Sequence, residues 1–263
     1  MLATIRRAAM PIRLAVSAVV GLAAFFVSAA SSVVVALPPV VGIVREAGAP
    51  ASVSVLSLIS AGGDPHSFEP SARDIRAVAD ASLYCSIGFP FEDRLLARVR
   101  ALRPDLRVVA LTNGCALRPG DPHLWLSISN RAVLVRNAAR ALGLPPPAAG
   151  LPLLATGHES QATRHPPSAV VSCHPSWDYL AADLGVTVID LEREGREPTA
   201  RSLAADLARA KALGVRTVIS EPQFSRRTAE RFAAELGARV VVLDPLAVDS
   251  RLSVSNFIEA VRE

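Results

Sequence analysis

Short apolar runs alternate along the chain with longer amphipathic stretches. The short runs are five to nine residues long, are rich in Val, Ile and Leu, and are mostly bounded by Gly, Pro, Asp or Ser, which is typical of β-strands. The predicted strands are SSVVVAL, SVSVLSLIS, SLYCSI, RVVALT, SAVVSC, VTVIDL, RTVIS and RVVVLD. Because helical patterns separate them, the sequence predicts an α/β fold with mostly parallel sheets and crossover helices.

The predicted helices are SARDIRAVADA, FEDRLLARVRAL, NRAVLVRNAARALG, SWDYLAADLG, TARSLAADLARAKALG and SRRTAERFAAELG. Ser71 and Asp74 form a capping box at the start of the first, and several of these stretches end in Gly, as helix C-termini commonly do. Glu92 and Asp93 open the second helix, where acidic residues suit the helix dipole, and we expect both to be solvated.

A proline-rich stretch without periodicity divides this pattern in two. Residues 145–167 read PPPAAGLPLLATGHESQATRHPP, which is typical of a linker, and its His158 and His165 are expected to be ordinary loop residues. The prediction is therefore an N-terminal α/β lobe over residues 31–144 and a C-terminal α/β lobe over residues 168–263.

The first thirty residues have the anatomy of a secretory signal peptide. Arg6, Arg7 and Arg13 precede the apolar run LAVSAVVGLAAFFV, and Val27-Ser28-Ala29 offers a small-residue cleavage site. We expect residues 1–30 to direct export to the periplasm. The alternative is an uncleaved membrane anchor, because SSVVVAL continues the apolar character.

Composition and charge narrow the function classes. The chain has 263 residues, 51% of them hydrophobic and 20% charged, which fits a folded globular protein. Its formal net charge of +4 becomes +1 without the signal, which carries three arginines and no acidic residue. The remaining arginines are scattered among acidic residues and aromatic residues are few, so nucleic acid is not an expected partner.

Three cysteines are too few for a disulfide scaffold in a chain of this size. They are Cys85, Cys115 and Cys173, and no CxxC pair is present to bind a metal. A Cys85–Cys115 bridge is compatible with an oxidising compartment. The favoured interpretation is that the cysteines are small buried hydrophobic residues.

Candidate ligands follow the predicted strands. His66 and His123 come from the N-terminal lobe, each within the tripeptide Asp-Pro-His, and His174 and Asp244 come from the C-terminal lobe. Because ligands in open parallel sheets bind beyond the carboxyl ends of the strands, we expect these four side chains to converge between the lobes. The aspartate of each tripeptide is suited to orient its loop or to accept a hydrogen bond from the imidazole.

Three imidazoles and one carboxylate form a four-coordinate set that suits Zn²⁺. Calcium and magnesium prefer oxygen ligands, so the set indicates a transition metal. Imidazole must be neutral to bind a metal, and we therefore expect the affinity to fall as the pH drops through the histidine range.

Four longer segments carry a family resemblance. They are GGDPHSFEPSARDIRAVADASLYCSIGFPFED, DPHLWLSISN, SCHPSWDYLAADLGV and ISEPQFSRRTAERFAAELGARVVVLDPL. In this order they resemble the metal-binding segments of the periplasmic substrate-binding proteins of zinc and manganese ABC transporters, the cluster A-I family. The likeness covers almost the whole chain after the signal.

The resemblance implies a function and a ligand set. His66, His123, His174 and Asp244 match the family's four metal-binding positions, and a histidine at the third position is similar to the zinc-binding branch. Glu221, in EPQFS, also follows a strand and is a candidate outer or spare ligand. The implied protein is a monomer, not an enzyme, that captures Zn²⁺, with Mn²⁺ as the alternative, and passes it to a membrane permease.

The sequence departs from the family pattern between the lobes. The family commonly has a long helix there, whereas this chain has the proline-rich linker, which implies a shortened interdomain region. Two other functions stay open at this point. One is a zinc-dependent hydrolase with a three-histidine site and Glu221 as general base; the other is a metal-independent periplasmic binding module.

Overall fold

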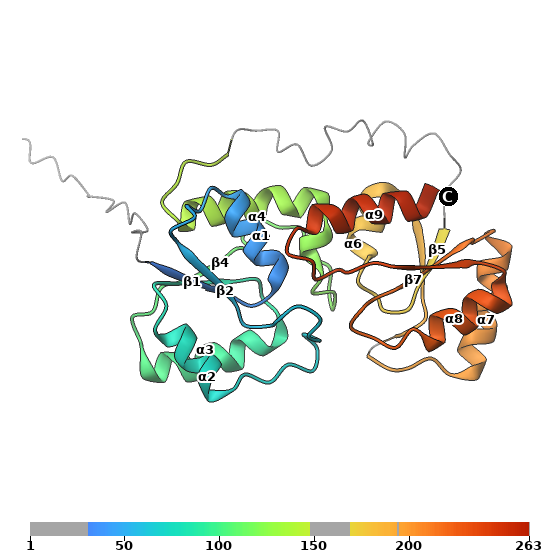
Figure 1. Cartoon of the computed structure of the whole chain (residues 1–263), viewed down its shortest axis with the longest axis horizontal. Coiled ribbons are helices and arrows are strands. Elements are labelled where there is room, and N and C mark those ends of the chain that lie inside the picture. Colours follow the sequence, from blue (N-terminus) through green and yellow to red (C-terminus); the bar gives the residue numbers. More distant parts are fainter. Residues whose placement is uncertain (1–30, 148–168, 194, 263) are drawn as a thin grey trace, which may run out of the picture.

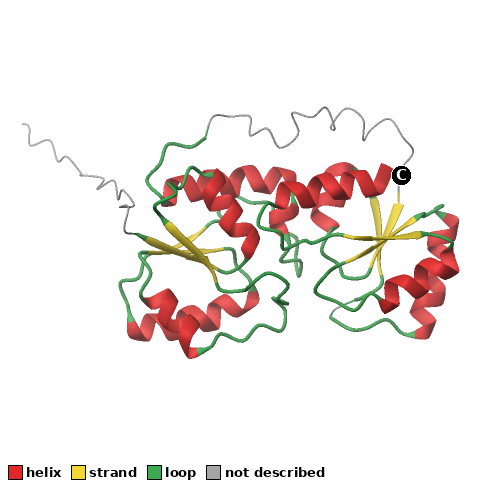
Figure 2. Ribbon diagram, viewed as in Figure 1, coloured by secondary structure: helices red, strands yellow, loops and turns green. Residues whose placement is uncertain are grey.

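The computed structural model describes residues 31–147, 169–193 and 195–262 (Figure 1). The predicted signal, most of the predicted linker, His158 and His165 lie outside these residues. The described residues form two lobes, each built on a sheet of four parallel strands (Figure 2). This confirms the predicted α/β class and its two-lobe organisation.

The two sheets share one strand order. The N-terminal sheet runs β2-β1-β3-β4 and the C-terminal sheet runs β6-β5-β7-β8. The strands are β1 (Ser32–Val35), β2 (Ser54–Ser57), β3 (Leu83–Ser86), β4 (Val108–Ala110), β5 (Ala169–Ser172), β6 (Thr187–Asp190), β7 (Thr217–Ser220) and β8 (Arg239–Val242). Each lies within one of the eight runs predicted from the sequence. In both sheets the chain reverses its direction of winding between the two central strands, β1 and β3 or β5 and β7, which is where such folds place ligands.

Helices cover both faces of each sheet (Figure 1). They are α1 (Pro38–Glu46), α2 (Ala72–Ala79), α3 (Pro90–Leu102), the 3₁₀ turn η1 (Leu124–Leu126), α4 (Ile128–Ala141), α6 (Asp178–Leu184), α7 (Ala200–Ala212), α8 (Arg227–Leu236) and α9 (Ser250–Arg262). The capping box of Ser71 and Asp74 starts α2, and Gly185 and Gly237 end α6 and α8 in the left-handed conformation.

The sequence prediction missed α1 and α9. Two prolines at the start of α1 resemble a helix breaker, yet proline is well tolerated in the first turn because its missing N–H has no helical partner there. Helix α9 is rich in serine and valine, which weakens its helical signal. None of the helices in the described part of the chain has the length and apolar character needed to span a membrane.

Two smaller predictions have mixed outcomes. Asp93 is exposed as expected, but the prediction that Glu92 is solvated was wrong. The Glu92 carboxylate tolerates burial because it accepts hydrogen bonds from Tyr84 Oη and from the backbone N–H groups of Ile87 and Phe89, just before the start of α3. The three cysteines are free thiols, so the Cys85–Cys115 bridge is not formed. Cys85 is fully buried as expected, whereas Cys115 and Cys173 are only half-buried.

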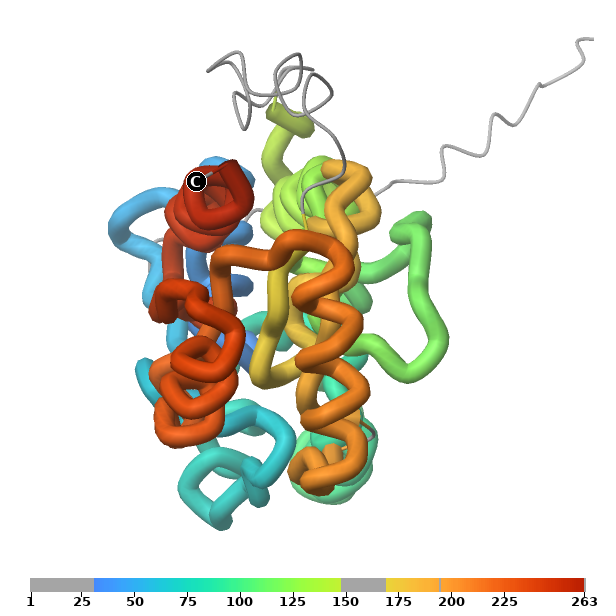
Figure 3. Tube along the Cα trace, turned by 90° about the vertical axis from the view of Figure 1, so that its right-hand side faces the viewer, coloured from blue at the N-terminus to red at the C-terminus, as the bar shows by residue number. Residues whose placement is uncertain are grey.

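One hydrophobic core runs through both lobes. It includes Trp125 and Val33 from the N-terminal lobe together with Trp177, Leu246 and Phe257 from the C-terminal lobe. Seen along the long axis of the molecule, the lobes lie one behind the other (Figure 3). The lobes are therefore held together by a shared hydrophobic core.

Close polar and backbone contacts reinforce this interface. The Asp183 carboxylate of α6 accepts hydrogen bonds from Ser127 Oγ (2.9 Å) and Ile128 N (2.6 Å) at the start of α4. Gly42 of α1 lies so near the backbone of Val248 that an added Cβ would come within 2.0 Å of the carbonyl oxygen. Only glycine permits this approach of the two lobes.

Candidate metal centre

Three histidines meet between the lobes. His66 lies in the loop between β2 and α2, His123 immediately precedes η1, and His174 follows β5 by two residues. One ligand nitrogen from each ring can be chosen so that all three lie within 4.8 Å of one another. Three of the four predicted site residues are therefore brought together by elements that are far apart in the sequence.

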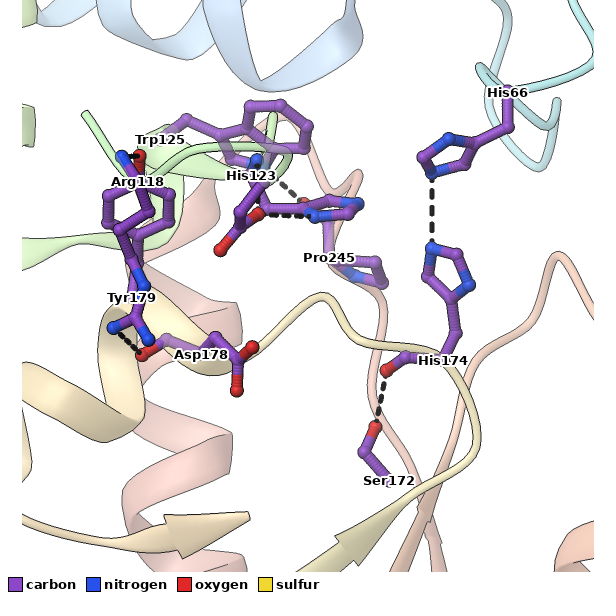
Figure 4. A network of polar contacts seen from close by, with 10 residues as sticks. His66, Arg118, His123, Trp125, Ser172, His174, Asp178, Tyr179 and Pro245 are labelled. Carbon is purple, nitrogen blue, oxygen red and sulfur yellow. Dashed lines mark hydrogen bonds and ion pairs between the residues drawn. The ribbon is translucent and has the colours of Figure 1, made fainter. Parts of the chain in front are cut away.

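The spacing of the rings suits a small metal ion. His66 Nε2 lies 3.1 Å from His174 Nε2 (Figure 4). Two ligands of a tetrahedral zinc site with bonds of about 2.0–2.1 Å are about 3.3 Å apart, so this pair is already near the required separation. The His123 ring centroid lies 5.4 Å from that of His66 and 5.4 Å from that of His174.

Carboxylates orient two of the three rings. His123 Nδ1 donates a hydrogen bond to Asp121 Oδ1, and His174 Nδ1 donates one to Glu192 Oε2, each over 2.9 Å. With the Nδ1 proton fixed in this way, Nε2 carries the free lone pair, as is usual for histidines that bind metals. Glu192 had not been singled out from the sequence, although it follows the end of β6, next to β5, and the strand-end rule that selected the histidines applies to it too.

The surroundings of His66 and His174 favour the neutral form of these two imidazoles. Although His66 is the exposed member of the trio, the part of its ring that faces the others is desolvated. This burial, followed by the positive charges that His174 and His123 can carry, lowers the pKa of His66 to about 4. Burial also lowers the pKa of His174, against the opposing effect of Glu192. Neutral imidazole is the form that binds a metal, so the site is prepared for a cation at neutral pH.

Asp244, the fourth predicted ligand, lies outside this cluster among the described residues. Its Oδ1 accepts hydrogen bonds from Gln223 Nε2 (2.7 Å) and from the backbone N–H of Leu246 (2.9 Å). Gln223 lies in the loop after β7 and Leu246 in the loop of Asp244 itself, so these bonds hold the carboxylate between two loops of the C-terminal lobe, and it is not among the clustered ligand atoms.

Glu221 instead lines the same pocket as the three histidines. Only 1% of this residue is exposed, and its Oε1 has no hydrogen-bond partner. Burial raises the pKa of Glu221 to about 8, while the nearby Ser176 hydroxyl and Trp177 indole act in the opposite direction. Neither group makes a hydrogen bond of good geometry with the carboxylate, since Ser176 Oγ and Trp177 Nε1 are also unpartnered.

Aromatic rings enclose the histidines. Phe89 packs edge-on against His66 and Trp125 packs edge-on against His123, while Phe224 lies tilted by 32° against His174; the ring centroids are 4.8–5.4 Å apart. Trp125 also donates a hydrogen bond from Nε1 to the Pro245 carbonyl over 2.8 Å, which ties the His123 loop to the other lobe (Figure 4). The pocket has a volume of about 10 Å³, close to the minimum that one water molecule needs.

The fold and the histidine cluster agree with the relatives of this chain. The family of zinc-uptake complex component A, periplasmic (ZnuA), matches residues 33–149 and 153–263. The chain belongs to this family. The zinc-binding protein AdcA of Streptococcus pyogenes serotype M1 is 23% identical over 240 aligned residues, which cover 73% of this chain. The chain spans about half of that relative, because the alignment covers 46% of AdcA.

Solved structures with the same fold include ZnuA itself. A crystal structure of ZnuA superposes with a TM-score of 0.76 and 28% identity, covering 87% of this chain and 96% of that one. FpvC of Pseudomonas aeruginosa in complex with Mn²⁺ superposes with a TM-score of 0.71 and 24% identity, covering 88% of this chain and 98% of that one. The likeness to FpvC shows the fold alone.

Proposed function

We propose that this protein captures Zn²⁺ in the periplasm and delivers it to the membrane permease of an ABC-type importer. The observation that carries the proposal is the meeting of His66, His123 and His174 between the lobes, with their ligand nitrogens within 4.8 Å of one another. Membership of the zinc-uptake family supports the same role. In this role zinc is the cargo, and the protein acts as a monomer that binds and releases it without catalysis.

The chemistry of the ligands favours zinc over manganese. Imidazole nitrogen suits zinc, whereas manganese prefers sites with more carboxylate or water oxygen. The two carboxylates hydrogen-bonded to the rings, Asp121 and Glu192, contribute negative charge without occupying a coordination position. They strengthen imidazole as a ligand and so support zinc binding. Mn²⁺ is the alternative cargo, and competition between the two ions in the titration described below distinguishes them.

A zinc-dependent hydrolase is less well supported. Three histidines with Glu221 nearby provide the groups that such an enzyme uses. Membership of the zinc-uptake family instead favours binding and release of the ion. The third candidate, a metal-independent binding module, does not explain why carboxylates orient two of three clustered imidazoles.

The direct test is a zinc titration of the metal-stripped protein against a competing chelator. We expect tight binding of one Zn²⁺ per chain, weaker binding of Mn²⁺, and a large loss of zinc affinity in His66→Ala, His123→Ala and His174→Ala. Zinc should also raise the unfolding temperature of the wild type, because a ligand bound only by the folded state stabilises it.

A cell-based test addresses delivery. A strain lacking the gene should grow poorly in zinc-depleted medium, and the wild-type gene should restore growth while the His123→Ala gene should not. If the purified protein binds no zinc, or if the three substitutions leave its affinity unchanged, the proposed function is wrong.

A further inference from the structure

The loop that carries His123 is held from both lobes. From its own lobe, the side-chain amide of Asn130 on α4 accepts a hydrogen bond from Ala116 N (2.7 Å) and donates one to the Ala116 carbonyl (2.9 Å). Two residues later the partner is the other lobe, because the backbone N–H of Arg118 donates to Tyr179 Oη of α6 over 2.6 Å. The support of the loop therefore changes lobes just before the stretch that contains His123.

Arg118 contacts the start of α6 in two further ways. Its guanidinium donates a hydrogen bond to the Asp178 carbonyl over 3.1 Å and lies over the Tyr179 ring, 5.7 Å from the centroid (Figure 4). Tyr179 itself is only 5% exposed and belongs to the hydrophobic core that joins the lobes. Its ring is thus a fixed anchor, because side chains in a close-packed core have little freedom to move.

A short path of hydrogen bonds leads from this anchor to the His123 ring. The Arg118 carbonyl accepts a hydrogen bond from Asp121 N over 3.2 Å, which closes the turn of residues 118–121. Asp121 Oδ1 then accepts hydrogen bonds from the backbone N–H and from Nδ1 of His123, each over 2.9 Å. Only two residues, Arg118 and Asp121, therefore stand between Tyr179 and a metal-binding ring.

The turn between Arg118 and Asp121 is stiff. Pro119 fixes φ at its second position, and Gly120 at its third position has a φ of +76°, which are the places that proline and glycine take in a type II turn. A stiff turn passes a displacement of its first residue on to its last. Releasing Arg118 from α6 therefore also shifts Asp121, the partner that orients His123.

We propose that Tyr179 is a positioning residue for zinc, which holds His123 in place across the lobe interface and thereby slows the release of the ion. The proposal rests on the proposed zinc-binding function and gives a part in it to a residue outside the ligand set. Zinc capture can begin at His66, the exposed member of the trio, whereas release requires the buried His123 to detach. Tyr179 should therefore act more on release than on capture.

The experiment compares the full-length wild type with Tyr179→Phe and with Tyr84→Phe as the matched control. Tyr84 is the other tyrosine of the chain, is fully buried, and donates its hydroxyl hydrogen bond to Glu92 within the N-terminal lobe. Each zinc-loaded protein is mixed rapidly with an excess of a colorimetric chelator to measure release. Each metal-stripped protein is mixed with zinc to measure capture.

The two tyrosine variants should differ in release. We expect Tyr179→Phe to release zinc about 3–10-fold faster, which corresponds to the net contribution of one neutral hydrogen bond, and to capture zinc at an unchanged rate. Tyr84→Phe should change neither rate. It should nevertheless lose at least as much stability in urea as Tyr179→Phe, because it removes a partner of a buried carboxylate. General loosening of the fold would instead make release follow stability.

A second variant tests the path through the turn. Gly120→Ala strains the turn at its positive φ, while the added Cβ meets no atom within 4 Å. It should also speed zinc release. Because both substitutions act on one path, the variant that combines Gly120→Ala with Tyr179→Phe should release zinc more slowly than the product of the two single effects predicts.

The outcomes are distinct. An unchanged release rate in Tyr179→Phe overturns the proposal, and so does an equal acceleration in Tyr84→Phe, while the proposed function stands if the wild type binds zinc. Fully multiplicative effects of Gly120→Ala and Tyr179→Phe also overturn it, because the turn then does not connect the anchor with His123. Should Tyr179→Phe not fold, an unchanged release rate in Gly120→Ala overturns the proposal. A wild type that binds no zinc overturns both proposals.

Discussion

Two loops with the same tripeptide, Asp-Pro-His, present their histidines in different ways. In both, the aspartate Oδ1 accepts a hydrogen bond from the backbone N–H of the histidine two residues later, over 2.9 Å. Asp121 also contacts the ring of His123, which is buried. His66 is the exposed member of the trio and, in the part of the chain that the structure describes, its ring hydrogen-bonds only with His174.

The difference shows what local sequence determines and what it does not. The tripeptide produces the same turn twice, because a short carboxylate beside a proline favours this backbone hydrogen bond. The orientation of the ring depends on the surroundings of the loop. The His123 loop is fastened to the C-terminal lobe by the Arg118 N–H, which donates to Tyr179 Oη over 2.6 Å, and by the bond from Trp125 to Pro245 (Figure 4).

The largest expected effect of this difference is on the zinc affinity that is lost when either histidine is removed. Structural zinc sites contribute about 10–16 kcal/mol, so one of four ligands is worth about 3 kcal/mol, or on the order of 100-fold in affinity. We expect His123→Ala to lose at least this much. His66→Ala should lose about tenfold less, because the His66 ring has no carboxylate partner to strengthen it as a ligand. Chelator competition measures both, and an equal loss would contradict the comparison.

The next largest effect is expected when the aspartate of each tripeptide is replaced, because Asp121 and Asp64 should contribute differently to zinc affinity. Asp121→Asn keeps an oxygen for the backbone turn but weakens the partner of the His123 ring, so zinc affinity should fall about 10–100-fold. Asp64→Asn makes the same change in the other loop, where the aspartate does not bond with the ring, and should lower the affinity by less than about threefold on this reasoning. Losses of the same size in the two variants would show that the contact of Asp121 with the His123 ring does not strengthen zinc binding.

A stability measurement tests the hydrogen bond that holds the His123 loop to the C-terminal lobe. Trp125→Phe removes the donor to the buried Pro245 carbonyl, and leaving such a group unsatisfied lowers the free energy of unfolding by about 1–3 kcal/mol. Trp177→Phe is the matched control, since Trp177 is equally buried but its Nε1 has no partner. Urea unfolding of the metal-free proteins should show the larger loss in Trp125→Phe, and the reverse order would count against the fastening.

The smallest expected effect concerns pH. The pKa of His66 is about 4 in the folded protein against 6.5 for an unperturbed histidine, so the unfolded chain binds more protons between these values. The stability of the metal-free protein should therefore fall as the pH drops from about 6.5 to about 4. In His66→Gln this slope should be shallower, with the remainder due to the lowered pKa of His174. Equal slopes in the two proteins, measured by urea unfolding at several pH values, would refute this contribution.

Much of the fold followed from the sequence because its strands are distinct. Short β-branched runs between turn residues predicted all of the strands that the structure describes, and the strand-end rule singled out His66, His123 and His174. The rule counts chain position and not register. It therefore passed over Glu192, which is level with His174 when the pairing of β5 with β6 is continued by two residues. Helices α1 and α9 were missed because burial in the shared core outweighs their weak local signals.

The shared core also sets the order in which the site can form during folding. Phe257 of α9 stacks on Trp177, with ring centroids 5.2 Å apart, and it follows every site residue in the sequence. The hydrogen bond from Trp125 to Pro245 joins residues 120 positions apart. Contacts between such distant parts of a chain form slowly. The core that joins the two lobes is therefore complete only after α9, the last helix of the described chain, has packed against Trp177.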